Sequence, residues 1–167
     1  MIMKVFTKNF LNYDTTYGNV KHFYGYKFTL GGIVSIKGDD YEKTNGFPNL
    51  WAWGFEDNMF QNRVIACGIH IDRSVFYPLM DKNILQLNDG YHRVINEQEH
   101  DKVVNQKTTD GINKITDIKY EFDEENNYIN ITEFKSLTEP NSKLNTTHDL
   151  RKGNLKVKKR RGKMMML

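Results

Sequence analysis

The chain has 167 residues, of which 38% are hydrophobic and 27% are charged, and its formal net charge is +3. This length and composition predict one domain with a packed core plus a tail, and the net charge alone is too small to indicate a polyanionic partner. No apolar run approaches the roughly 18 residues of a membrane span and no signal-type segment is evident, so we expect a soluble, cytoplasmic protein. The single cysteine, Cys67, excludes an intrachain disulfide and a cysteine-based zinc site.

The first predicted element is an extended region over residues 21–36, which is rich in aromatic and β-branched side chains. Gly31 and Gly32 interrupt it, and glycine inside a strand pattern indicates a bend, a bulge or a close approach to another group. A short helix is predicted over residues 40–44. The turn-forming cluster at residues 45–49 follows it.

An amphipathic helix is predicted over residues 56–67, ending at Gly68. Its apolar side chains recur near helical spacing, and they are Met59, Phe60, Val64 and Cys67. We interpret Cys67 as a buried small hydrophobic residue. The next predicted elements are short strands at residues 69–71 and 75–77 and a helix near residues 96–105, within an otherwise irregular polar region.

A β-hairpin is predicted from two segments of alternating apolar and polar residues, 117–122 and 128–134, on either side of a polar turn. The hydrophobic pattern then fades, and the segment from Arg151 to Lys163 is basic with no acidic residue. We therefore predict a domain over residues 1–145 and a basic, disordered tail over residues 146–167. Binding of the tail to nucleic acid or an anionic membrane is the alternative, and the absence of interleaved aromatic residues disfavours it.

One stretch suggests chemistry, because it places the only two tryptophans of the chain, Trp51 and Trp53, just before two adjacent carboxylates, Glu56 and Asp57. A tryptophan face suits the apolar side of a sugar ring, and carboxylates accept hydrogen bonds from sugar hydroxyls. A carboxylate ionised at a helix N-terminus can also act as a general base. The structural alternatives remain open: tryptophans near a turn often anchor a core, and acidic residues at a helix start often serve only as caps.

Three motifs in this sequence resemble those of the β-1,4-galactosyltransferase family. The sequence NGFPN-L-WAWGFEDN at residues 45–58 is similar to the family pattern NGFPN, an aromatic residue, then WGWGGEDDD. Upstream, LGGIVS at residues 30–35 is similar to FGGVSA, and downstream, DGIN at residues 110–113 resembles SDGLN. The resemblance extends over residues 20–135 and indicates the C-terminal, acceptor-binding and catalytic half of the family's domain.

The resemblance implies an α/β fold that is part of a nucleotide-sugar glycosyltransferase (GT-A-like) domain, with a small mixed sheet, a C-terminal β-hairpin and few helices. It also implies a hexosyltransferase that transfers a hexose from a UDP-sugar to a sugar acceptor hydroxyl with inversion. The nucleotide-binding half is not found in this chain, so we expect either that a partner chain supplies it or that this chain is cut short at its start.

Residue roles follow from the same resemblance. Asp57 matches the catalytic base and Glu56 the acceptor-binding carboxylate next to it. Trp53 matches the mobile tryptophan that closes over the substrates, and Gly54 its hinge. Further substrate-binding positions are expected at Gly31, Gly32, Trp51 and Asn58.

This sequence also departs from the family pattern. Asn58 replaces an aspartate and cannot serve as a base, while Phe55 and Ala52 replace glycines. The family implies a manganese cofactor, but Asn83 and Gln86 stand where its methionine and histidine ligands are expected, and amide oxygens are weak ligands. No metal ligand is therefore assigned.

Two other interpretations compete with an active transferase. A catalytically inactive glycan-binding or structural remnant is the main alternative, and a nucleic-acid-binding protein that uses its tail is the weaker one. His70 and Asp72, which would share one face of a strand, invite a metal interpretation, but two ligands without a third leave them unassigned.

Overall fold

The computed structural model describes residues 3–5, 11–86, 90–104, 109–126, 128–138 and 142–153. Three α-helices lie in this part of the chain, and they are α1 (Gly38–Lys43), α2 (Glu56–Ala66) and α3 (Glu97–Val104). Its strands are β1 (Met3–Val5), β2 (Asn19–Gly25), β3 (Ile33–Ser35), β4 (His70–Asp72), β5 (Tyr77–Pro78), β6 (Ile84–Gln86), β7 (His92–Asn96), β8 (Ile115–Asp123), β9 (Tyr128–Ser136) and β10 (Asn145–Asp149). Short 3₁₀ turns occur at Ile112–Lys114, Ser142–Leu144 and Leu150–Lys152.

A small mixed sheet forms the centre of the molecule, with β2 as its common strand. β3 pairs with β2 in the antiparallel direction, whereas β4 and β5 pair with it in the parallel direction. The β8–β9 hairpin and the antiparallel pairs β1–β6 and β7–β10 are separate two-stranded sheets. This confirms the predicted mixed sheet with a hairpin and few helices.

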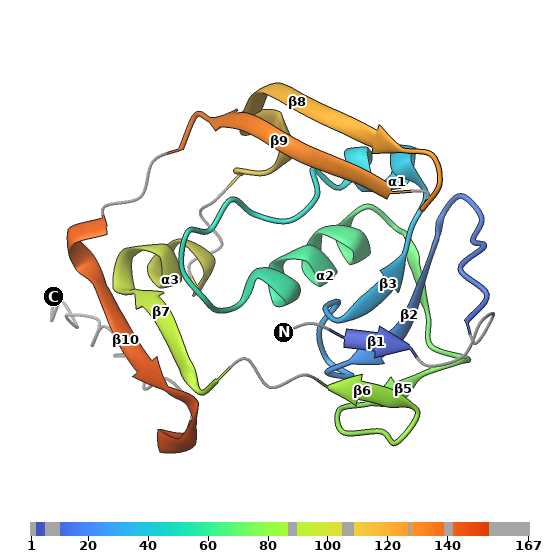
Figure 1. Ribbon diagram of the computed structural model, residues 1–167, viewed down its shortest axis with the longest axis horizontal. Coiled ribbons are helices and arrows are strands. Elements are labelled where there is room, and N and C mark those ends of the chain that lie inside the picture. The colour runs from blue at the N-terminus through green and yellow to red at the C-terminus, as the bar shows by residue number, and fades with distance from the viewer. Residues whose placement is uncertain are drawn as a thin grey trace, which may run out of the picture.

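The helix α2 lies between the mixed sheet on one side and α3, β7 and β10 on the other, while the hairpin runs along a third side (Figure 1). Its buried face consists of Met59, Phe60 and Val64, as the helical spacing predicted. Cys67 is half-buried at the end of the helix and packs against the core. Within the described residues, no helix is both long and apolar enough to cross a bilayer.

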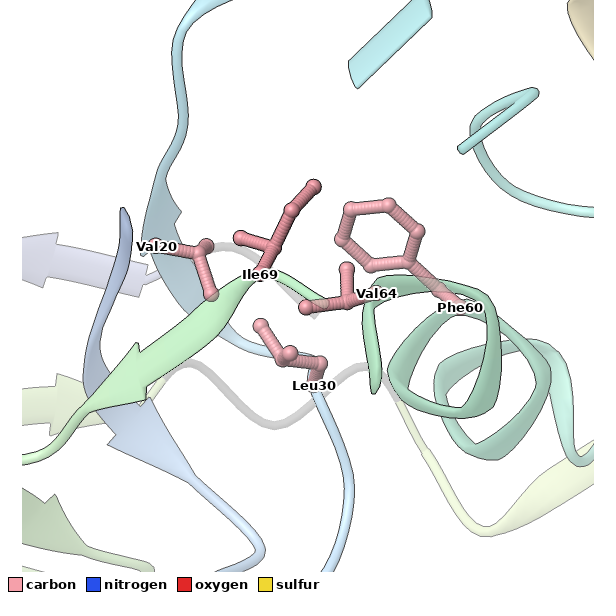
Figure 2. Packing of buried hydrophobic residues seen from close by; sticks show 5 residues of the cluster. All are labelled: Val20, Leu30, Phe60, Val64 and Ile69. Carbon is pink, nitrogen blue, oxygen red and sulfur yellow. The ribbon is translucent and has the colours of Figure 1, made fainter. Parts of the chain in front are cut away.

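The hydrophobic core fills the space between α2 and the sheet. Figure 2 shows side chains from the sheet region and from α2 converging there. The residues of this cluster are Val20, Leu30, Phe60, Val64 and Ile69. Phe47, which follows the Asn45–Gly46 turn, stacks on Phe60 with 4.3 Å between ring centroids. Core packing therefore fixes the loop before α2 as well as the helix itself.

The structure differs from the predicted domain boundary at residue 145. Residues 145–149 form β10, which pairs with β7, and a 3₁₀ turn follows up to Lys152. Disorder was predicted from residue 146 onward because the hydrophobic pattern fades and a basic block follows, but residues 146–149 are paired with β7. The rest of the predicted tail, residues 154–167, lies outside the described residues.

Candidate active site

The loop that leads into α2 has an unusual backbone. Gly54 has φ 128° and Phe55, the residue that caps α2, has φ 69°. A left-handed conformation costs a non-glycine residue about 1–2 kcal/mol, so Phe55 is strained where the family pattern has glycine. Glu56 supports this turn, because its Oε2 accepts a hydrogen bond from the Gly54 backbone N–H at 3.0 Å.

Asp57 lies directly against Gly31, although the two residues come from separate motifs. A Cβ atom on Gly31 would overlap the Asp57 carboxylate. The neighbouring backbones are joined as well, since the Leu30 N–H donates to the Asp57 carbonyl oxygen at 3.2 Å. The absence of a side chain at residue 31 thus creates the space that the Asp57 carboxylate occupies.

The surroundings of Asp57 favour its protonated form more than water does. Burial raises the pKa of Asp57 above its ordinary value, and the negative charge of Glu56 adds to the effect. A carboxylate with a raised pKa is a stronger base once ionised, which is the property expected of a group that removes a proton from a hydroxyl.

We predict that Gly31→Ala lowers the free energy of unfolding by about 1–3 kcal/mol, because the new methyl group needs the volume of the Asp57 carboxylate. In an Asp57→Ala background the same change should cost less than about 0.5 kcal/mol. Urea denaturation of the four proteins measures this coupling. Gly38→Ala is the matched control, because a Cβ there meets nothing within 4 Å. Equal costs of Gly31→Ala in both backgrounds would contradict the proposed contact.

The two tryptophans lie on the surface and not in the core. Trp51 is 46% exposed and Trp53 is 43% exposed. The Trp51 indole N–H donates to the carbonyl oxygen of Thr138 at 3.0 Å, and the Trp53 backbone N–H donates to that of Val94 at 2.7 Å. The loop is therefore tied to β7 and to the segment after β9, while both tryptophans stay exposed to solvent.

Two further predicted positions do not join the Asp57–Gly31 contact. Gly32 has φ 84°, and a Cβ there would collide with the carbonyl of Tyr24, so this glycine permits close packing on β2. Asn58 is half-buried in the first turn of α2.

Hydrogen bonds join the motif at residues 45–58 to the motif at residues 110–113. Asn45 donates through its side chain to Thr109 O at 2.8 Å and accepts from the Asn113 N–H at 3.0 Å. Asn49 donates to Gly111 O at 2.9 Å. The guanidinium of Arg63 on α2 donates to the carbonyl oxygens of Asn45, Gly46 and Asp110. These contacts hold the turn before the tryptophans in place.

The described residues do not fit a manganese site. No group of three His, Cys, Asp or Glu side chains in this part of the chain is placed to hold a metal. Asn83 forms a turn in which its backbone and side-chain N–H groups both donate to Asp81 Oδ1, each at 2.8 Å. The Gln86 side chain lies outside the described residues. Asp72 accepts from the Ser74 N–H at 2.8 Å, and hydrogen bonds from Ser74 lower its pKa.

Sequence reasoning missed three residues next to the candidate site. His22, Gln61 and Arg73 form a hydrogen-bonded group behind Gly31. The histidine and the arginine are 51 residues apart, and no local spacing signal connects them. The one feature of the sequence that could have indicated this group was a histidine, His22, within a strand pattern of mainly apolar residues.

Comparison with known proteins agrees with the motifs. Residues 13–85 match a family model described as the N-terminal domain of galactosyltransferase, a segment that contains Gly31, Trp53 and Asp57. Beta-1,4-galactosyltransferase 6 of Homo sapiens is 41% identical over 49 residues, which cover 29% of this chain and 13% of that protein. Beta-1,4-galactosyltransferase 3 of Homo sapiens is 34% identical over 91 residues, which cover 52% of this chain and 23% of that protein.

The matched segments span less than a quarter of either relative. The description of the family model names an N-terminal domain, whereas our assignment to the acceptor-binding half rests on the motif order. The family model, the two relatives and the three sequence motifs all indicate the galactosyltransferases. Residues 13–85 are therefore similar to the galactosyltransferase family, and the motifs and the relatives support β-1,4-galactosyltransferases as the family to which this chain is related.

Proposed function

We propose that this chain carries the acceptor-binding and catalytic half of a glycosyltransferase of the galactosyltransferase type, within a GT-A-like fold. The observation that carries the proposal is the Asp57 carboxylate, which occupies the space left by Gly31 and has a raised pKa at the start of α2. The match of residues 13–85 to the galactosyltransferase family model supports the same conclusion.

In the proposed reaction, an acceptor sugar hydroxyl attacks the anomeric carbon of a UDP-hexose. Asp57 takes the hydroxyl proton as the new carbon–oxygen bond forms and the bond to the diphosphate breaks, so that UDP leaves and the configuration inverts. Glu56 holds the loop through Gly54, and the exposed faces of Trp51 and Trp53 are the surfaces on which the sugars would stack. Because the described residues do not fit a metal site, no step is assigned to manganese.

The relatives are named β-1,4-galactosyltransferases, so UDP-galactose is the donor that we propose first. The test incubates the purified chain with UDP-galactose, manganese and an N-acetylglucosamine acceptor, and detects the disaccharide and its anomeric configuration by NMR. A β-linked product supports the proposal and shows that the chain acts without a partner.

If the chain binds N-acetylglucosamine but yields no product, an added partner that binds the nucleotide sugar separates two outcomes. Product that forms only with the partner supports a divided enzyme. Glycan binding with no turnover under either condition would favour the inactive remnant.

A further inference from the structure

His22 is completely buried on β2, and both nitrogens of its ring have partners. Nδ1 lies 2.9 Å from Arg73 Nε. Nε2 lies 2.9 Å from the carbonyl oxygen of Gly31 and 3.1 Å from that of Tyr24. The ring edge also packs on Phe76 at 4.9 Å between centroids.

These partners define the tautomer of His22. The Arg73 guanidinium can only donate, so Nδ1 must be the unprotonated nitrogen that accepts. The proton therefore sits on Nε2, which donates to the Gly31 carbonyl. Burial, followed by the charge of Arg73, lowers the pKa of His22, so the neutral ring persists at ordinary pH.

The same group holds other parts of the loop between β2 and β3. Arg73 donates to the Thr29 carbonyl at 3.3 Å and to Gln61 Oε1 at 2.8 Å. Gln61, on α2, donates to the Phe28 carbonyl at 3.0 Å. Side chains from β2, from α2 and from the residue after β4 thus fix three carbonyls of one loop.

Gly31 consequently lies between two constraints. On one side its carbonyl accepts from His22, and a Cβ on Gly25 would approach both the Gly31 carbonyl oxygen and, at 3.1 Å, His22 Nε2. On the other side Gly31 meets the Asp57 carboxylate. The His22 ring, the Gly31 backbone and the Asp57 carboxylate are packed in direct contact. A change in the position of the His22 side chain should therefore displace Gly31 and, with it, the Asp57 carboxylate.

We propose that His22, fixed in its Nε2–H tautomer by Arg73, is a positioning residue that holds Gly31 against Asp57 and thereby sets the location of that carboxylate. The inference rests on the proposed function only for the catalytic role of Asp57. The contacts from His22 through Gly31 to Asp57 can be tested without measuring enzyme turnover. The competing explanation is a histidine that only fills the core.

The experiment compares His22→Leu, which cannot donate, with His22→Gln, whose amide can donate to Gly31 and accept from Arg73. The first readout is the pKa of Asp57, obtained from the pH titration of its ¹³C-labelled carboxyl group by NMR. The His22→Leu change should shift this pKa downward toward the ordinary value, because a relaxed loop admits water, and His22→Gln should restore most of the shift. His70→Leu, on the exposed edge of β4, is the matched control and should leave the pKa unchanged.

A core-filling role would lower the free energy of unfolding in His22→Leu without moving the Asp57 pKa, and that outcome would overturn the proposal. If His22→Leu does not fold, Gln61→Leu loosens Arg73 at a partly exposed site and should shift the Asp57 pKa in the same direction by less. An unchanged Asp57 pKa in folded Gln61→Leu would then overturn it. A ¹⁵N spectrum of the unmodified chain that places the His22 proton on Nδ1 would overturn it as well.

Turnover provides a separate readout. With an active preparation, His22→Leu should reduce kcat by about 10- to 100-fold with little change in KM, because a misplaced base affects the chemical step more than binding. If Asp57→Asn leaves turnover intact while His22→Leu still moves the Asp57 pKa, the proposed function fails and the positioning contact stands.

Discussion

Replacing Asp57 with asparagine should reduce hexose transfer by about 100- to 10,000-fold, the range expected when a general base is lost. Asparagine keeps the shape of the side chain that occupies the space beside Gly31, but it cannot accept a proton. Initial rates with saturating donor and acceptor measure the effect on kcat. Glycan binding should be retained, which separates loss of chemistry from loss of the site.

The control for this change is Asp14→Asn, which alters an exposed carboxylate before β2 and should leave both kcat and KM within about twofold. Transfer by Asp57→Asn at more than a tenth of the original rate would exclude Asp57 as the base. It would direct attention to Glu56, the other carboxylate in the same turn.

Because the pKa of Asp57 is raised, the pH dependence of the free energy of unfolding provides a second test that does not require activity. Because the folded-state pKa lies above the unfolded one, ionising Asp57 costs folding free energy at neutral pH. This cost disappears as pH falls below the ordinary aspartate pKa, where Asp57 is protonated in both states. Asp57→Asn should therefore be more stable than the original chain at pH 7, with a gain that vanishes toward pH 3.

In the active enzyme, Glu56→Gln should move the acidic limb of the rate profile to lower pH, because it removes the negative charge next to Asp57 and so lowers the pKa of Asp57.

The sequence predicted the elements whose patterns are local. The helix over residues 56–67 was identified from the spacing of Met59, Phe60 and Val64, and the structure places all three in the buried face of α2. The hairpin was identified from alternation, and only its ends differ, since β8 and β9 extend further than predicted.

The strand β10, which the sequence did not predict, depends on a distant partner. Its sequence Asn-Thr-Thr-His-Asp has no alternation of apolar and polar residues, and asparagine and aspartate are disfavoured in strands, so the pattern alone does not indicate the strand that pairs with β7. The contact between Gly31 and Asp57 was likewise beyond local reasoning. The resemblance to the galactosyltransferases predicted functional roles for both residues, but only the fold shows that one fills the space left by the other. His22 carried no motif, and the role proposed for it rests on burial and on hydrogen bonds at both ring nitrogens that sequence spacing does not reveal.

Arg63→Ala should lower the free energy of unfolding by about 2–4 kcal/mol. Its guanidinium donates to Asn45 O at 3.2 Å, to Gly46 O at 2.7 Å and to the Asp110 carbonyl. Charge-assisted hydrogen bonds contribute about 1.5–3 kcal/mol each, and water can replace part of this at a half-buried site. Urea denaturation followed by circular dichroism measures the loss.

The location of the damage is as informative as its size. Arg63 connects α2 to the turn at Asn45 and to the segment that contains Asp110, so hydrogen exchange should accelerate first at the Ile112 and Asn113 amides, which are bonded to Asn45. Arg63→Lys keeps the charge but not the two-pronged geometry, and should recover about half of the stability. Asn62→Ala, at the exposed neighbouring position, should change stability by less than about 0.5 kcal/mol. If Arg63→Ala behaves like Asn62→Ala, the two motifs are held together by core packing alone, and the turn before the tryptophans does not depend on this arginine.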